Sequence, residues 1–439
     1  MLHMKRRDLL KNVATVGVAT AMGATVEPTA APAAMTAATM MGVPFEKRDV
    51  VRIGFIGCGG RGGGLFNDLL NIKGVEFKAV CDVVATRAES FANRAEKAGQ
   101  KRPQVYAAGD RDYEKLCARE DIDLVYIATP WDWHVPMAVC AMEHGKHAAV
   151  EVPAATTLAD CWKLVETSER TRKHCIQLEN CCYGYTERMV LNMCKKGVFG
   201  ELVHGEAAYN HDLRSLLLAD SGEGLWRRAP HITRNGNLYP THGLGPVAQY
   251  MGVHKGDRFT RLVSMSSQSV ALAEYRDSHV PADSPKRKEV YKCGDMNTSL
   301  IQTAQGRTVI LQHTVTLPRP YSRLNVIEGS RGIFMDYPAR FFIEGQKGGE
   351  SFVGPEVYKQ YEDPLWQKEG DTARKLGGHG GMDYIMNFRL IECYQSGLTP
   401  DMNCYDAAAW SAPGPLSEES IKKGSSGILF PDFTRGNWK

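Results

Sequence analysis

The chain has 439 residues, of which 43% are hydrophobic and 23% are charged, a composition typical of a folded protein with an ample core. Its 53 basic and 50 acidic residues leave a net charge of only +3, which excludes the strongly basic surface expected of a nucleic-acid-binding protein. Length alone predicts two or three domains.

The twelve cysteines are spread singly through predicted strands and helices, apart from the adjacent pair Cys181 and Cys182. No C-x-x-C pair occurs, so the spacing indicates neither a zinc site nor a disulfide framework. We therefore predict buried free thiols and no metal site.

The first 45 residues predict an export signal followed by a linker. A basic segment with adjacent Arg6 and Arg7 precedes a mildly apolar stretch at 12–26, and proline and alanine follow. This order is typical of a signal peptide, and paired arginines are typical of the twin-arginine route. The apolar stretch is too short and too weak to span a membrane, and the alternative to a signal is a disordered basic tail. We expect a periplasmic protein without a stable membrane anchor.

A glycine-rich turn follows the first predicted strand, 51–56, which is apolar and rich in β-branched residues. The turn fits G-x-G-x-x-G, with its glycines at Gly57, Gly59 and Gly62, and a helix is expected from about Leu65. Such glycines allow a tight turn, close approach of the backbone to a pyrophosphate and close packing of the helix on the strand. The alternative is a glycine-rich surface turn.

An acidic residue ends the second predicted strand, 76–81. Asp82 lies twenty positions after Gly62, where a carboxylate can bind the ribose 2′-OH of a dinucleotide. Further strands are predicted at 123–129, 147–152 and 175–179, with helices at 87–97 and 159–172. This alternation predicts that residues 46–182 form an α/β Rossmann domain with a doubly wound parallel sheet, whose ligand contacts follow the strand ends.

The pattern changes to that of an α+β substrate domain over residues 183–402. A large, mostly antiparallel sheet is predicted from strands at 201–210, 261–268, 298–303, 308–316, 324–328 and 332–337, with helices at 186–196, 243–252 and 381–396. The charged stretch 275–289 is expected to be a surface loop. Residues 403–439 are expected to be a tail with one helix at 417–423, packed on the body because it carries aromatic side chains.

A second group of polar side chains surrounds the start of a predicted helix. Thr241 is expected to cap that helix, with His242 in its first turn and Tyr239 just before it. A helix N-terminus disfavours an imidazolium, so His242 is predicted to be a neutral hydrogen-bonding group or base. Judged from local sequence alone, a capping or packing histidine is the alternative.

From residue 50 onward the chain resembles the glucose–fructose oxidoreductase / inositol dehydrogenase superfamily. More closely, it resembles glycoside hydrolase family 109, the NAD-dependent α-N-acetylgalactosaminidases. The resemblance rests on Gly57-x-Gly59-Gly60-Arg61-Gly62, Trp131-Asp132-Trp133-His134, Glu151-Val152-Pro153, Asn180, 239–246, Tyr321, 410–417 and 431–436.

The resemblance implies an NAD cofactor and two sets of site residues. The NAD site would be lined by Gly57, Gly59, Arg61, Gly62, Asp82, Trp131, Trp133, His134, Glu151, Val152 and Asn180. The sugar site would be lined by Tyr209, Arg227, Tyr239, His242 and Tyr321. Catalytic roles would fall to His242, Tyr239, Tyr321 and Tyr183, although ordinary packing is the simpler interpretation of Tyr183.

One departure from the superfamily bears on the reaction. Its sugar dehydrogenases carry Glu-Lys-Pro, with a lysine that assists proton removal, and here Val152 takes that place. This favours the hydrolase branch, which the resemblance implies cleaves α-N-acetylgalactosaminides with retention. Its steps would be C3 oxidation, C2 deprotonation, elimination, water addition and re-reduction.

Two alternatives remain, an exported sugar oxidoreductase and a non-catalytic nucleotide-binding sensor. The expected partner is a small glycoside or the terminal sugar of a glycan. A homo-oligomer is compatible with the sequence.

Overall fold

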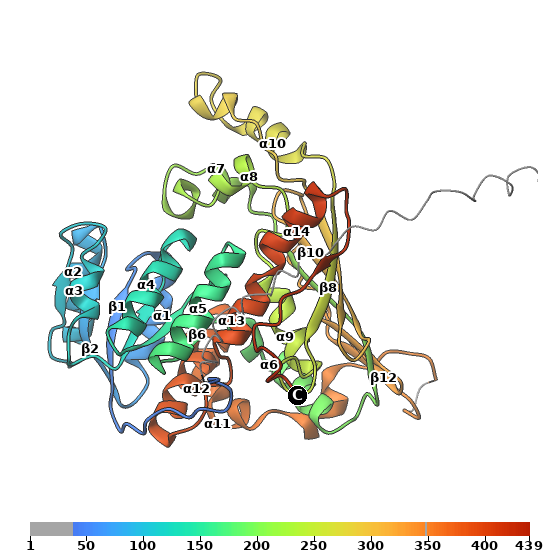
Figure 1. Ribbon diagram of the computed structural model, residues 1–439, viewed down its shortest axis with the longest axis horizontal. Coiled ribbons are helices and arrows are strands. Elements are labelled where there is room, and N and C mark those ends of the chain that lie inside the picture. Colours follow the sequence, from blue (N-terminus) through green and yellow to red (C-terminus); the bar gives the residue numbers. More distant parts are fainter. Residues whose placement is uncertain (1–37, 347–348) are drawn as a thin grey trace, which may run out of the picture. The chain divides into compact units, whose positions relative to one another are not determined.

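The computed structural model describes residues 38–346 and 349–439, and within them the strands form two sheets (Figure 1). One sheet has six strands in the order β3-β2-β1-β4-β5-β6, and the other has eight in the order β13-β12-β11-β7-β10-β9-β8-β14. Most of the predicted signal and linker lies outside the described residues. Within those residues, no helix combines the length and the apolarity needed to cross a membrane.

The six-stranded sheet is parallel throughout. Its strands are β1 (Val51–Ile56), β2 (Val75–Cys81), β3 (Gln104–Tyr106), β4 (Leu124–Ile127), β5 (His147–Val150) and β6 (Cys175–Gln177). The helices between them are α1 (Gly60–Leu70), α2 (Ala85–Lys97), α3 (Tyr113–Cys117), α4 (Trp131–Glu143) and α5 (Leu158–Thr171). This strand order is that of a dinucleotide-binding doubly wound sheet, which confirms the predicted fold class. The sequence analysis missed β3, whose three residues are too few to show a pattern.

The eight-stranded sheet is antiparallel except where β7 pairs with β10, so the prediction of a mostly antiparallel sheet is also confirmed. Its strands are β7 (Leu202–Asn210), β8 (Phe259–Ser266), β9 (Asn297–Thr303), β10 (Thr308–Thr314), β11 (Val326–Gly329), β12 (Gly332–Met335), β13 (Arg340–Ile343) and β14 (Ile428–Leu429). Helices of this half are α6 (Tyr185–Lys195), α7 (Arg214–Leu218), α8 (Ala229–Thr233), α9 (Thr241–Tyr250) and α10 (Ala271–His279). Helix α9 packs on β7.

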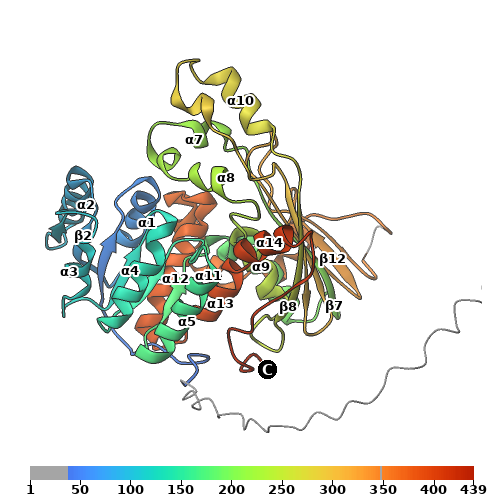
Figure 2. The same cartoon turned by 45° about the horizontal axis from the view of Figure 1, so that its top comes forward.

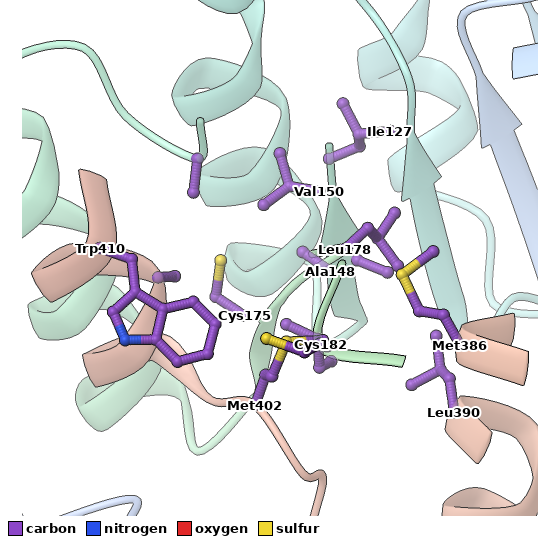
Figure 3. Close-up of a cluster of buried hydrophobic side chains, with 14 of the residues drawn as sticks. Ile127, Ala148, Val150, Cys175, Leu178, Cys182, Met386, Leu390, Met402 and Trp410 are labelled. Carbon is purple, nitrogen blue, oxygen red and sulfur yellow. The ribbon is translucent and has the colours of Figure 1, made fainter. Parts of the chain in front are cut away.

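The C-terminal helices return to the parallel sheet. They are α11 (Pro364–Leu376), α12 (Met382–Ser396), α13 (Cys404–Ser411) and α14 (Pro413–Lys422). Helix α12 packs on α1, and α13 packs on α5 and β6, while α14 lies on β8 (Figure 2). Figure 3 shows the resulting core, in which Met386 and Leu390 of α12 and Trp410 of α13 surround Val150 and Leu178. The last segment of the chain therefore contributes to both halves of the fold.

Short 3-10 helices complete the structure at Asn180–Tyr183, Gly222–Leu225, Pro285–Lys288, Pro355–Tyr361 and His379–Gly381. All twelve cysteines lie in the described residues and are free, and all except Cys140 and Cys194 are buried.

The stretch 275–289 lies at the surface as expected, but it is not a continuous loop, because it contains the end of α10 and a 3-10 helix. One carboxylate oxygen of Asp295 accepts from the backbone N–H groups of Val270 and Ala271 and so holds the start of α10. That partner lies 24 residues away from Ala271, which a local pattern does not reveal.

The start of one helix and the number of helices in the tail also differ from prediction. Helix α1 begins at Gly60 rather than near Leu65, so the glycine motif itself forms its first turn. The tail contains two helices rather than one, and the earlier of them, α13, begins with a capping box formed by Asn403 and Asp406. Glycine and alanine-rich stretches show little hydrophobic periodicity, which explains both errors.

Candidate active site

The glycine-rich turn after β1 has one tightly packed side and one open side. A Cβ on Gly57 would lie 2.3 Å from the carbonyl oxygen of Ala128, and one on Gly62 would lie 2.0 Å from that of Gly57. A Cβ on Gly59 or Gly60 would meet no atom within 4 Å. The packed glycines hold the turn against the sheet, and the open ones leave backbone at the N-terminus of α1 accessible. This cradle fits the pyrophosphate of a dinucleotide.

Asp82 stands beside this turn at the end of β2. Its Oδ2 accepts from the backbone N–H of Cys58 at 2.7 Å, and its Oδ1 accepts from that of Val84 at 2.8 Å. These bonds hold the carboxylate at the position from which an acid in a dinucleotide-binding fold binds the ribose hydroxyls. The turn and the acid together fit NAD.

A buried ion-pair network joins three of the predicted cofactor residues. Arg61 donates to Glu151 Oε1 at 2.7 Å and to Asp383 Oδ2 at 2.6 Å, and Asn180 donates to Asp383 Oδ1 at 2.6 Å. Burial alone would raise the pKa of Asp383, but a hydrogen bond from His379 and the charge of Arg61 hold it well below its usual range. Asp383 was not predicted from the sequence, because it lies at the start of α12, 203 residues from Asn180.

The first turn of α4 sends its side chains in different directions. Trp131 packs against Tyr239, with ring centroids 5.7 Å apart, and belongs with Val152 to the apolar cluster that also contains the predicted sugar residues Tyr209 and Tyr239. Trp133 instead packs edge-on against Tyr113 of α3, 6.2 Å away. Each helix position turns by about 100°, so side chains two positions apart, like those of Trp131 and Trp133, point to nearly opposite sides of the helix and do not line one surface.

His134 is 1% exposed and contacts backbone on both sides. One ring nitrogen lies 2.8 Å from the carbonyl oxygen of Thr129, and the other lies 2.8 Å from that of Pro153. The ring thus ties together the segments that follow β4 and β5. His134 therefore supports the backbone of the segment that carries Glu151 and Val152.

The five predicted sugar-site residues lie together. The Tyr209 ring centroid lies 4.6 Å from that of Tyr239, 5.4 Å from that of His242 and 6.1 Å from that of Tyr321. The Arg227 guanidinium carbon lies 4.8 Å from the Tyr239 centroid. They come from β7, from the segment before α8, from α9 and its preceding residues, and from the segment before β11. We call these five residues the aromatic group.

Two polar neighbours of the aromatic group were missed by the sequence analysis. Glu223 accepts from Arg227 at 2.6 Å, which neutralises a guanidinium that is 8% exposed. His211 Nδ1 lies 3.1 Å from the Tyr209 hydroxyl, and its ring lies 4.9 Å from that of Tyr321. Glu223 does not follow a strand end, so its position in the sequence gave no indication of a site. His211 directly follows β7, and its position could have indicated one.

His242 connects the aromatic group to Glu179, which was also not predicted from the sequence. Its Nδ1 lies 2.7 Å from Glu179 Oε1, and its Nε2 lies 3.5 Å from the Tyr239 hydroxyl. Glu179 is 0% exposed and follows β6, one position before Asn180. Thr241 does not cap the helix, because α9 begins at Thr241 itself and the position before it is Pro240. The predicted cap is therefore wrong, although His242 does lie in the first turn.

Glu179 and His242 also lie near the thiol of Cys181. Their ligand atoms fall within 4.8 Å of one another, a donor set that could hold a metal ion. The distance of 2.7 Å between His242 Nδ1 and Glu179 Oε1 is nevertheless shorter than two ligands of one tetrahedral zinc ion allow, roughly 3.3 Å for bonds of about 2.0 Å. We therefore describe the contact as a hydrogen bond.

Two glycines allow α9 to approach this closely. A Cβ on Gly243 would lie 2.4 Å from the backbone nitrogen of Ala208 in β7. A Cβ on Gly245 would lie 3.0 Å from Glu179 Cγ and 3.2 Å from Trp410. The spacing His-Gly-Leu-Gly thus places the helix on the strand and on Glu179 at once.

Tyr183, the fourth predicted catalytic residue, belongs to a different cluster of buried side chains from Tyr209 and Tyr239. It is 3% exposed, its hydroxyl donates to Asp401 at 3.3 Å, and the Arg188 guanidinium carbon lies 5.5 Å from its ring centroid. The 3-10 helix that carries it turns the ring into the core under α12. Ordinary packing, the simpler interpretation, describes this tyrosine.

Comparison with known proteins places this geometry in a family. Residues 183–439 match the model of the glycosyl hydrolase 109 C-terminal domain, and residues 51–178 match that of the oxidoreductase family NAD-binding Rossmann fold. A glycosyl hydrolase family 109 protein of Solibacter usitatus (strain Ellin6076) is 53% identical over 437 residues, covering 99% of this chain and 98% of the relative. One of Shewanella baltica (strain OS185) is 46% identical over 449 residues, covering 100% and 98%.

Solved structures share the fold at lower identity. Levoglucosan dehydrogenase in complex with NADH superposes with a TM-score of 0.66 at 17% identity, covering 87% of this chain and 99% of that one. An inositol dehydrogenase homolog from Azotobacter vinelandii, complexed with NAD⁺, gives 0.62 at 16% identity, covering 88% and 99%. With its NAD-binding Rossmann domain and its full-length relatives, this chain belongs to glycosyl hydrolase family 109 and is a glycoside hydrolase.

Proposed function

We propose that this enzyme hydrolyses α-N-acetylgalactosaminides by oxidation, elimination, water addition and reduction, with retention at C1. The observation that carries the proposal is that the segment after β4 serves both parts of the site. Its Ala128 packs on Gly57 of the dinucleotide cradle, and its Trp131 packs on Tyr239 of the aromatic group. Glu179 and Glu223 are paired with His242 and Arg227. They therefore do not form the free carboxylate pair of an ordinary glycosidase.

The chemistry follows from the acidity of the sugar's C2–H bond. When bound, NAD supplies reversible hydride exchange at C3 of the sugar. Beside a C3 carbonyl, the C2 proton becomes acidic enough for a side chain to remove it, and the resulting enolate expels the C1 substituent. Water then adds at C1, and return of a proton to C2 precedes restoration of the C3 hydroxyl. The net reaction consumes one water and releases the sugar and an alcohol.

The residues of the aromatic group supply position and proton transfer. His242 Nε2 and the hydroxyls of Tyr239 and Tyr321 exchange protons with the substrate. Burial raises the pKa of Tyr239 well above its usual range, so its hydroxyl remains a donor at neutral pH. Arg227 presents a buried cation that can donate to sugar oxygens. Val152, in place of a lysine, leaves proton transfer to these groups.

The fate of the C2 and C3 hydrogens tests the proposal. Product formed in D₂O should carry deuterium at C2, substrate deuterated at C3 should turn over more slowly, and thioglycosides should be cleaved, because expulsion from an enolate needs little acid assistance. Complete hydrolysis with neither C2 exchange nor a C3 isotope effect would overturn the mechanism. Accumulation of NADH with an oxidised sugar would instead identify a sugar oxidoreductase.

We also propose that the protein is exported by the twin-arginine route. The support is the adjacent Arg6 and Arg7 before the apolar stretch, in a protein that must fold around a nucleotide. Replacing both arginines by lysine should leave the protein in the cytoplasmic fraction. Unchanged accumulation in the periplasm would contradict the route.

A further inference from the structure

We propose that Glu179 is a positioning residue that fixes the tautomer of His242. In this assignment Nδ1–H donates to Glu179, and Nε2 carries the lone pair that accepts a proton from the substrate. The assignment rests on the proposed function for its catalytic meaning, but the tautomer itself is a property of the folded protein.

The partner of Nδ1 determines where the ring proton lies. Glu179 Oε1 is 2.7 Å from His242 Nδ1 and also accepts from the backbone N–H of Cys181 at 3.1 Å. An ionised carboxylate only accepts hydrogen bonds, so Nδ1 must be the protonated nitrogen of a neutral ring. Burial by itself would raise the pKa of Glu179. The charge of His242 when its ring is protonated, and the hydrogen bonds from the His242 ring and from the Cys181 backbone, instead lower this pKa below its ordinary value, so the carboxylate is ionised.

The other ring nitrogen faces the aromatic group. His242 Nε2 lies 3.5 Å from the Tyr239 hydroxyl, and the His242 side chain is 13% exposed whereas Glu179 is 0% exposed. The opening of this site is therefore on the Nε2 side. A substrate proton can reach Nε2 directly or through the Tyr239 hydroxyl, and it cannot reach Nδ1 past the carboxylate.

Close packing prevents Glu179 from turning away. Its Cγ would lie only 3.0 Å from a Cβ at Gly245, and that Cβ would also lie 3.1 Å from Cys182 Sγ and 3.2 Å from the Trp410 ring. Cys182 and Trp410 belong to the core between α13 and the parallel sheet (Figure 3). The carboxylate is thus held between the two halves of the fold, with α9 directly above it.

The arrangement also stabilises the protonated ring. When Nε2 takes a substrate proton, the imidazolium lies beside a carboxylate that water does not screen, so the charge pair is stronger than at the surface. The proton later returns from Nε2 to the sugar, and nothing is oxidised or reduced in this exchange. Without the carboxylate, part of the ring population would carry its proton on Nε2 and could not act as a base.

Nitrogen NMR of the whole enzyme labelled with ¹⁵N-histidine tests the tautomer. The His242 signals, assigned by their loss in His242→Gln, should show a protonated Nδ1 and an unprotonated Nε2 at neutral pH. The opposite tautomer, or rapid exchange between both, would overturn the proposal. This readout needs no substrate, so it stands even if the proposed reaction is wrong.

The kinetics of the Glu179→Gln variant provide a second test of the proposal. The variant should retain NAD and change KM by only a few fold, while kcat falls by about 10²- to 10⁴-fold and the His242 signals show a shifted tautomer. Glu418→Gln, which breaks a carboxylate pair with Arg234 away from the aromatic group, is the matched control. An unchanged kcat in Glu179→Gln, or a loss of kcat with the wild-type tautomer intact, would show that Glu179 does not act through the tautomer of His242.

Discussion

The carboxylate of Asp82 accepts a hydrogen bond from the backbone N–H of Cys58 at 2.7 Å, which holds an acid against the glycine-rich turn. This bond keeps a negative charge at the position of the adenosine ribose in a dinucleotide-binding sheet. Cofactor choice follows directly from it.

Nucleotide released from the denatured enzyme should be NAD rather than NADP, because the Asp82 carboxylate repels a 2′-phosphate. Asp82→Ser should weaken NAD binding by roughly 10- to 100-fold, which corresponds to about 1.5–3 kcal/mol for a charge-assisted hydrogen bond, and should reduce discrimination against NADP. Mass spectrometry of the released nucleotide and titration of the apoenzyme measure both effects. Recovery of mainly NADP(H) would contradict the assignment.

His242→Ala should keep its bound NAD but lose turnover by roughly two to four orders of magnitude, the scale of a general acid–base group. His279→Ala removes a comparable ring from the exposed end of α10 and serves as the control. Initial rates on an aryl α-N-acetylgalactosaminide, normalised to the NAD content, give the comparison. Equal rates for the two variants would remove His242 from the reaction.

Tyr183→Phe should leave kcat and KM near their wild-type values, because this hydroxyl bonds Asp401 in the core. The variant should lose only about 1 kcal/mol of unfolding free energy, the usual value of one hydrogen bond. Tyr239→Phe should instead lower kcat by at least about tenfold. A large catalytic defect in Tyr183→Phe would mean that this ring reaches the substrate.

Gly243→Ala should destabilise the protein by roughly 3 kcal/mol or more, because the new Cβ would lie 2.4 Å from backbone of β7 that cannot move aside. Gly64→Ala, in α1 where a Cβ meets nothing within 4 Å, should stabilise it by about 0.5–1 kcal/mol. Urea unfolding compares the two variants. Similar midpoints would contradict the close packing of α9 on β7.

Lowering the pH should destabilise the fold through His174, which packs against Phe45. The Phe45 ring lies 4.7 Å from His174, whose backbone N–H donates to His147 Nδ1 at 2.9 Å. Burial lowers the pKa of His174 to about 4, below the value of about 6.5 in an unfolded chain. Because the unfolded state binds the proton more readily, protonation of His174 does not lower the free energy of unfolding above pH 6.5. It lowers that free energy progressively as the pH falls toward 4.

At pH 5 the titration of His174 alone should reduce the free energy of unfolding by about 2 kcal/mol. His174→Phe keeps a ring against Phe45 but cannot titrate, so its urea midpoint should fall less between pH 7.5 and pH 5 than that of the wild type. Identical pH dependence in the two proteins would exclude His174 as a source of acid sensitivity.

The sequence by itself determined the features that depend on neighbours along the chain. A β-branched run followed by the glycines at 57–62 predicts a strand and a phosphate-binding turn, because strand burial and turn geometry need only adjacent residues. The acid that follows β2 and the alternation of strands and helices were predictable for the same reason. The segment 239–246 was one of several motifs that carry the family resemblance, and it placed His242 in the first turn of α9.

Only the tertiary structure decided which buried polar groups meet. Glu179 and His242 are separated by 63 positions, and Asp383 and Asn180 by 203, so no local pattern pairs them. A buried carboxylate must find a donor, but which donor it finds depends on how closely the elements pack. Gly243 and Gly245 bring α9 close enough for His242 to reach Glu179, whereas the turn after β6 directs Tyr183 into the core.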